Sequence, residues 1–290
     1  MDMGGTQAAG LRQAVIRTLA GLAADDSGES DDRPPLVLLH GLTFDRRMWR
    51  PSLDELQRID PGRRVLTLDL PGHGASPGWP SYDVASVARG VFRAVEEAEL
   101  DSPVVVGHSI GGVIATFYAA QYPTRGVINV DQPLQIAPFA DLVQSLAGQL
   151  RGPGFPGAWQ MFAASMHVEL LPDAGQELVR SSCRPRQDLV LGYWREVLDR
   201  PAGELADLVG ATLAAVRGAR VPYHVVAGDD LQAGYRKWLT EMLPQATVAV
   251  WPGSGHFPHI AHPGRFAACL AAGGSGGSNA AIIASAMKTP

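Results

Sequence analysis

Six short runs of apolar residues recur along the chain, and each of them leads into a small polar cluster. They are rich in β-branched residues and nearly continuous in apolar character, which is typical of strands buried on both faces of a parallel sheet. Segments with a helical pattern, such as residues 84–100 and 111–122, lie between them. This alternation predicts an α/β fold, with a mostly parallel sheet and helices on both faces. The runs are residues 36–39, 65–68, 103–106, 127–130, 221–227 and 247–251.

A long excursion separates the fourth run from the fifth. It has a helical pattern, loop breaks at Gly-Pro-Gly and Pro-Gly, and several aromatic residues and methionines. These apolar side chains can pack the excursion onto the core, line a pocket at the strand ends, or do both. We therefore predict a core of residues 1–131 and 221–272, a helical lid of residues 132–220, and a flexible, linker-like tail of residues 273–290.

Two further segments precede the first run. Residues 11–24 are predicted to form one or two short edge strands, and the acidic residues 25–32 are predicted to form a solvated loop.

The composition excludes several classes of protein. The 290 residues carry a net charge of −5, and they show no clustered basic charge of the kind that a nucleic-acid surface needs. Two cysteines exclude a disulfide framework and a cysteine-based metal site. No apolar stretch is long enough to span a membrane, and the N-terminus lacks the features of a signal peptide. We expect a cytoplasmic protein that acts on a small molecule; no pattern specifies its oligomeric state.

The strongest chemical signal is the sequence Gly-His-Ser-Ile-Gly at residues 107–111. It follows a predicted strand and opens a predicted helix, which is the setting of a G-x-S-x-G nucleophile turn. The glycines allow a tight, strained turn, and the turn presents the Ser109 hydroxyl above the sheet at the positive end of a helix. Ser109 is therefore the predicted nucleophile.

A serine hydroxyl needs an adjacent base to become nucleophilic at neutral pH. His256 follows the last predicted strand and a glycine, and it stands well after Ser109, in the chain order Ser…Asp/Glu…His. The carboxylate that orients this base has two possible positions. Asp229 or Asp230 follows the fifth run, which is the usual place, and Asp131 follows the fourth run.

The oxyanion that forms during attack on a carbonyl group needs two N–H donors. Ile110, directly after the nucleophile, supplies one of them. The loop after the first run should supply the other, through Leu42, because Gly41 lets the backbone approach the pocket. His40 is expected to brace this loop.

Together these motifs resemble the α/β-hydrolase fold superfamily, in its esterase- and lipase-like branch that has a serine nucleophile. The resemblance covers residues 33–131 and 221–271 and includes Asp-Leu-Pro-Gly-His-Gly at residues 69–74. It implies a mostly parallel sheet, a helical lid, a Ser-His-acid triad, an oxyanion hole at Leu42 and Ile110, and a structural role for residues 69–74. One departure matters. Relatives often show Gly-x-x-Asp after the penultimate strand, and here Leu231 stands at the position of the acid.

The residues and the resemblance predict a serine hydrolase that cleaves an ester, thioester or lactone of a small, largely apolar substrate through an acyl-enzyme. No cofactor or metal is expected. Carbon–carbon bond hydrolysis and perhydrolysis use the same set of catalytic residues, and the fold alone does not determine which of these reactions occurs. A catalytically slow small-molecule receptor on the same scaffold is the alternative from another class.

Overall fold

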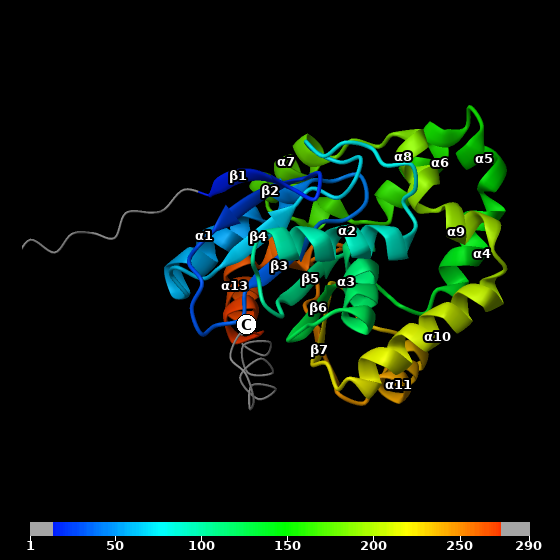
Figure 1. The fold of residues 1–290 in the computed structure, drawn as a ribbon. Coiled ribbons are helices and arrows are strands. Elements are labelled where there is room, and N and C mark those ends of the chain that lie inside the picture. The colour runs from blue at the N-terminus through cyan, green and yellow to red at the C-terminus, as the bar shows by residue number, and fades with distance from the viewer. Residues whose placement is uncertain (1–13, 274–290) are drawn as a thin grey trace, which may run out of the picture.

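A computed structural model describes residues 14–273, and these residues form one eight-stranded sheet in the order β1-β2-β4-β3-β5-β6-β7-β8 (Figure 1). Strands β3 to β8 are parallel to one another, whereas β2 pairs antiparallel with β1 and with β4. The predicted mostly parallel α/β sheet is therefore confirmed. The strands are β1 Val15–Leu19, β2 Leu22–Ser27, β3 Leu36–Leu39, β4 Val65–Leu68, β5 Val104–His108, β6 Gly126–Val130, β7 Tyr223–Ala227 and β8 Ala246–Val250.

The central strands are apolar at every position because both faces of the sheet are covered. In β3, Val37 and Leu39 point into a core shared with α2 and α3, whereas Leu36 and Leu38 point into a second core shared with α1 and α13. All four side chains are fully buried. Alternate residues of a strand point to opposite faces, so a strand between two helical layers has no polar side.

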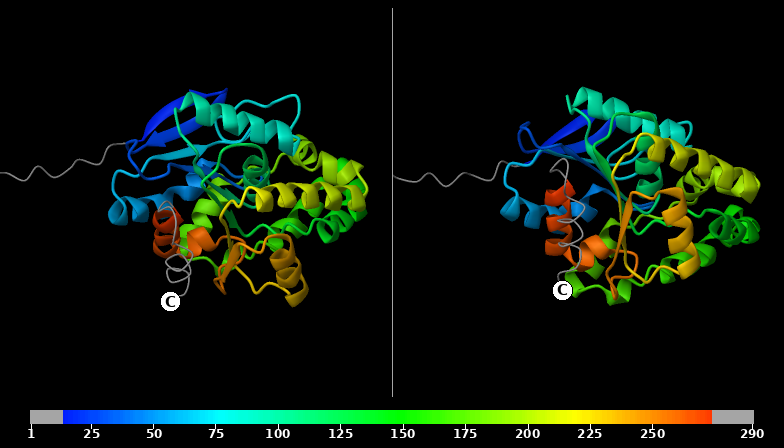
Figure 2. Two further views of the ribbon diagram at one scale, coloured as in Figure 1. Left: turned by 60° about the horizontal axis from the view of Figure 1, so that its bottom comes forward. Right: turned by 90° about the horizontal axis from the view of Figure 1, so that it is seen from below.

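Helices α1 and α13 lie side by side on one face of the sheet, although they come from opposite ends of the chain (Figure 2). Helices α2, α3 and α10 cover the other face. The helices are η1 Arg46–Trp49, α1 Arg50–Ile59, α2 Val84–Glu97, α3 Ile110–Gln121, α4 Ala137–Ser145, α5 Ala147–Arg151, α6 Phe155–Ala164, η2 Val168–Leu170, α7 Asp173–Ser182, α8 Gln187–Tyr193, α9 Arg195–Asp199, α10 Ala202–Gly218, α11 Ala233–Met242, α12 Pro258–Ala261 and α13 Pro263–Gly273.

The chain between β6 and β7 is helical from α4 to α10, and most of these helices gather at the right-hand end of the molecule in Figure 1. We call residues 132–220 the insertion. The predicted tail, residues 273–290, lies outside the described residues except for Gly273, the last residue of α13. Within residues 14–273, the helices are too short or too polar to cross a membrane.

The acidic segment, residues 25–32, differs in part from its prediction as a solvated loop: residues 28–32 lie outside any helix or strand, whereas residues 25–27 belong to β2. Strand β2 continues through Asp25 and Asp26 to Ser27. Asp26 is buried, and its carboxylate pairs with Arg17 at 2.7 Å and with Arg64 at 2.9 Å. A buried carboxylate is tolerated where cations are placed against it, and local sequence does not reveal these partners.

Candidate active site

Strand β5 ends at His108 and helix α3 begins at Ile110, so Ser109 alone makes the turn between them. Its φ of 52° lies in a region that residues with a β-carbon rarely adopt. Neighbouring backbone explains the two glycines of the motif. A β-carbon at Gly107 would lie 2.0 Å from the Gly111 oxygen, and one at Gly111 would lie 2.3 Å from the Leu39 oxygen. The motif therefore builds a tight, strained turn that exposes a hydroxyl at a helix N-terminus.

His256 lies in the loop between β8 and α12, and the insertion contacts its main chain. The His256 N–H donates to the Met166 carbonyl oxygen at 2.9 Å. Gly255, directly before it, has a φ of 51°, and a β-carbon there would lie 2.7 Å from that same oxygen. The insertion thus packs directly against the loop that carries the predicted base.

The structure brings Asp131 to His256. Asp131 follows β6 with a φ of 52°, and its Oδ2 lies 2.6 Å from His256 Nδ1. Its other carboxylate oxygen accepts a hydrogen bond of 2.8 Å from the Gly228 N–H at the end of β7. Because Nδ1 donates to the carboxylate, the neutral imidazole keeps a lone pair on Nε2.

The structure does not bring Asp230 to His256. The Asp230 side chain is 88% exposed and lies 3.4 Å from Arg236, and Asp229 is also exposed. The reason is the close approach of backbone at the end of β7. A β-carbon at Gly228 would lie 1.7 Å from the Gly255 oxygen. The β7 end therefore meets the histidine loop with its main chain, and the side chains that follow point to solvent.

A buried polar network supports the turn that carries Asp131. The Asn129 side-chain oxygen accepts from the Gln132 N–H at 3.1 Å, and its nitrogen donates to the Gln132 oxygen at 2.9 Å and the Tyr223 hydroxyl at 3.0 Å. The Tyr223 hydroxyl also lies 2.7 Å from Thr116 Oγ1. The sequence analysis missed this network. Its only signal was an asparagine inside an otherwise apolar strand.

The loop after β3 is held in a defined conformation beside Ser109. The Thr43 N–H donates to His73 Nε2 at 3.0 Å, and the Thr43 oxygen accepts from the Arg184 N–H of the insertion at 2.7 Å. Burial lowers the pKa of His73 well below its usual value, so the ring stays neutral and can accept this bond. Leu42 lies within this fixed loop. Ile110 is the first residue of α3, where N–H groups have no partner inside the helix.

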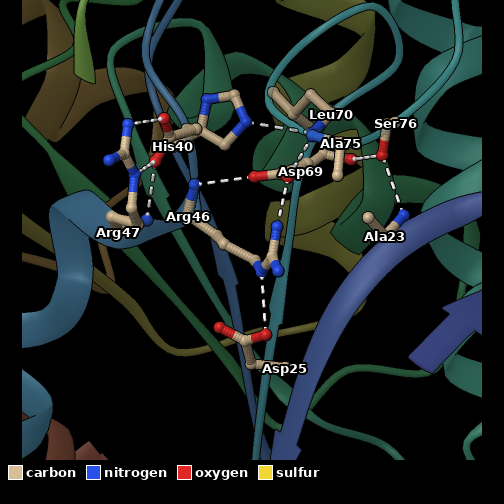
Figure 3. Close-up of polar contacts among 10 residues, drawn as sticks. Ala23, Asp25, His40, Arg46, Arg47, Asp69, Leu70, Ala75 and Ser76 are labelled. Atoms are coloured by element: carbon tan, nitrogen blue, oxygen red, sulfur yellow. Dashed lines mark hydrogen bonds and ion pairs between the residues drawn. The ribbon is translucent and has the colours of Figure 1, made fainter. Parts of the chain in front are cut away.

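Asp69 anchors the neighbouring loop, residues 69–74, through contacts that are structural (Figure 3). Its buried carboxylate accepts from the Arg46 N–H at 2.9 Å and from the Ala75 N–H at 2.8 Å, and it also pairs with the Arg46 guanidinium. His40 Nε2 accepts from the Leu70 N–H at 2.9 Å, which ties this loop to the one that carries Leu42. These contacts fit the bracing role expected for His40.

A cavity of about 360 Å³ joins the predicted site residues with the insertion. Ser109, His256 and Asp131 line it together with Leu42 and Ile110. None of its lining residues, all within the described part of the chain, is a lysine or an arginine, and Glu196 adds a second carboxylate. The insertion supplies a largely apolar wall that includes Phe139, Trp159, Phe162, Met166, Tyr193, Trp194, Val197, Leu205, Leu208 and Val209.

The chain is similar in sequence to several curated enzymes. A pimeloyl-[acyl-carrier protein] methyl ester esterase of Chromobacterium violaceum is 30% identical over 256 residues, covering 82% of this chain and 93% of the relative. A 2-succinyl-6-hydroxy-2,4-cyclohexadiene-1-carboxylate synthase of Yersinia pseudotuberculosis is 28% identical over 247 residues, covering 81% and 85%.

Solved structures show the same fold. An AqdC variant, described as recognising and cleaving the ring of the Pseudomonas quinolone signal, superposes with a TM-score of 0.71 at 20% identity, covering 93% of this chain and 99% of that one. Residues 36–269 match the alpha/beta hydrolase family. The esterases among the relatives support a hydrolase activity, and this chain belongs to the alpha/beta hydrolase family.

Proposed function

We propose that this protein is a serine esterase that hydrolyses neutral carboxylic esters of small, largely apolar substrates. The observation that carries this proposal is the contact of 2.6 Å between His256 Nδ1 and Asp131, on a cavity wall shared with Ser109. This contact leaves Nε2 of His256 free to accept the proton of a serine hydroxyl.

In the proposed reaction, Ser109 Oγ attacks the ester carbonyl carbon while its proton passes to His256 Nε2. The N–H groups of Leu42 and Ile110 stabilise the resulting oxyanion, and the Asp131 carboxylate stabilises the imidazolium. Collapse of this intermediate breaks the bond to the alcohol oxygen, which takes the proton from His256. Water, deprotonated by His256, then attacks the acyl-enzyme and releases the carboxylic acid and Ser109.

The cavity supports the substrate class. Its volume of about 360 Å³ lies near the lower end of the range for ligand pockets, roughly 300–1,000 Å³, which favours a small substrate. Its wall is mostly apolar, and the absence of lysine and arginine from the lining disfavours an anionic substrate group inside it. A methyl ester, the group printed in the name of the Chromobacterium violaceum relative, carries no charge and therefore fits this wall.

We further propose that the insertion is a lid that determines which esters enter. Its side chains form much of the apolar wall, whereas the proposed nucleophile, base and acid all lie on the core, at the ends of β5, β8 and β6. Changes in the insertion should therefore alter chain-length preference more than they alter the chemical step.

The test is hydrolysis of p-nitrophenyl esters of graded chain length, with lactones for comparison. We expect turnover of neutral esters and loss of turnover by a factor of about 10⁵–10⁶ in Ser109→Ala, because that variant lacks the nucleophile. A fluorophosphonate probe should label the native protein on Ser109 and should not label Ser109→Ala. Retained turnover in Ser109→Ala would refute the nucleophile, and tight small-molecule binding without labelling would indicate a receptor.

A further inference from the structure

His108, the residue before the proposed nucleophile, packs against the proposed base His256. It is the last residue of β5 and is completely buried. Its Nε2 lies 2.8 Å from the main-chain carbonyl oxygen of His256, which is 148 positions further along the chain. Because a carbonyl oxygen can only accept, the His108 Nε2 atom carries the hydrogen and donates it.

The His108 ring is held by packing on several sides. Its ring centroid lies 4.6 Å from that of His256 and 4.7 Å from that of His259, and the Phe257 ring lies at 5.3 Å. On the Gly41 side, a β-carbon added to that glycine would lie 2.8 Å from His108 Nδ1. This packing leaves the imidazole little freedom to turn, so its hydrogen bond stays directed at the His256 carbonyl.

His108 is also neutral. Burial, reinforced by the neighbouring His256 and His259, lowers the pKa of His108 well below its usual value. A neutral ring suits this position, because the proposed mechanism makes His256 a cation in each turnover, and a second cation beside it would oppose that step.

His108 completes the set of contacts that fix His256. The N–H of His256 donates to the Met166 oxygen, its side chain contacts Asp131, and its carbonyl accepts from His108. Of these three contacts, the one from His108 is made by the side chain adjacent to the proposed nucleophile. One short segment, residues 108–109, thus carries the proposed nucleophile and also contacts the main chain of the proposed base.

We propose that His108 is a positioning residue, which holds the main chain of His256 so that Nε2 faces the Ser109 hydroxyl. This inference rests on the proposed function, since it requires His256 to be the base. A small displacement of a reacting group, about 1 Å, can reduce the rate by about 10²-fold without weakening substrate binding.

The test compares His108→Gln, whose terminal amide N–H can reach the same carbonyl, with His108→Asn, whose shorter amide stops near the position of Nδ1. We expect His108→Asn to lower kcat on p-nitrophenyl esters by about 10- to 100-fold with KM within twofold. His108→Gln should recover most of the lost kcat. A purely structural role would instead show itself as equal kcat in both variants.

A matched control comes from the same stack of rings. His259 is as deeply buried and lies against His108, yet its ring makes no hydrogen bond within the described residues. His259→Phe keeps an aromatic ring against His108 and loses no hydrogen bond, so it should keep kcat within twofold, even if its melting temperature falls.

Two results would overturn the proposal: equal kcat in the glutamine and asparagine variants of His108, or an equal loss in His259→Phe. Ser109→Ala, assayed in parallel, reports on the proposed function separately. If Ser109→Ala is inactive while both His108 variants keep full activity, the esterase proposal stands and the role of His108 is wrong.

Discussion

The ends of β6 and β7 lie side by side in the sheet, and each is followed by an aspartate, yet they contribute to the site in different ways. At the β6 end, Asp131 adopts a left-handed backbone conformation and its carboxylate contacts His256. At the β7 end, the main-chain N–H of Gly228 contacts that carboxylate, and Asp230 points to solvent. One strand end therefore supplies the carboxylate, and its neighbour supplies a donor that holds it.

The difference shows that a carboxylate needs more than a place at the end of a strand. Asp131 has a backbone turn that aims it, a buried network behind that turn, and a donor for its second oxygen. Among residues 14–273, the partner of Asp230 is the exposed Arg236, and exposed ion pairs contribute little to stability. The following predictions test this contrast.

Among the changes at these two strand ends, the largest effect is expected for Asp131→Asn. The asparagine side-chain nitrogen would face Nδ1 of His256 and favour the tautomer with the proton on Nε2, which cannot accept the Ser109 proton. We expect kcat to fall by about 10⁴-fold, measured on a p-nitrophenyl ester, with no change in the circular dichroism spectrum. A loss of less than tenfold would mean that the carboxylate has another source.

A smaller loss is expected for Gly228→Ala. The added methyl would overlap the Gly255 oxygen, so the loop that carries His256 must move. We expect a loss of about 10² in kcat and about 1–3 kcal/mol in the free energy of unfolding, measured by steady-state kinetics and urea titration. Gly234→Ala in α11 is the matched control, because a β-carbon there meets no atom within 4 Å. Equal kcat and equal free energies of unfolding in the two variants would show that the backbone at Gly228 is not closely packed against the loop at Gly255.

The next prediction concerns stability rather than rate. His224 of β7 is buried, it hydrogen-bonds Thr247 of β8, and burial lowers its pKa to about 4. The unfolded chain takes up a proton at His224 as the pH falls through about 6.5, whereas the folded protein does so only near 4. The contribution of the neutral His224 to the free energy of unfolding is therefore fully present above pH 6.5 and is lost as the pH falls toward 4.

Replacing His224 by glutamine should remove this dependence. The free energy of unfolding is measured by urea titration at pH 7 and at pH 4.5. Between these two pH values it should fall by up to about 3 kcal/mol more in the native protein than in His224→Gln. An identical loss in the two proteins would show that His224 is not held neutral in the folded state.

The smallest effect is expected for Asp230→Asn. This side chain is exposed and its ion pair with Arg236 is long, so kcat and melting temperature should both stay close to those of the native protein. A loss of kcat comparable to that of Asp131→Asn would reverse the contrast between the two strand ends.

Much of the fold could be predicted from the sequence, because a strand that is buried on both faces appears as a short, nearly continuous run of apolar residues. Strands β3 and β4 were predicted with the bounds that the structure has, and the other four parallel strands differ by no more than two residues at either end. The prediction of a loop over the acidic segment was wrong at residues 25–27, which belong to β2, and holds at residues 28–32. Arginines distant in the sequence pair with Asp25 and Asp26 there, and this pairing leaves no local pattern.

The site residues also fall into two groups: those that local sequence predicts and those that depend on contacts between distant segments. Ser109 could be predicted because its turn needs glycines at fixed spacing, and His256 because of its place after the last strand. The acid stayed open between Asp131 and Asp230, since the outcome depends on the sign of φ at one residue and on the approach of the Gly228 and Gly255 backbones. The hydrogen bond from His108 joins segments that only the folded sheet brings together.

The carbonyl of Met166 has a consequence for protein engineering. Exchanging the whole of residues 132–220 between family members, in order to transplant substrate preference, would also exchange the group that receives the N–H of His256. A chimera should therefore keep the native turn at residues 165–167, together with Gly255 that packs against it, and place its crossover points on either side. A donor segment grafted without that turn would supply a new pocket wall, but the loop that carries His256 would lose its hydrogen bond to residue 166.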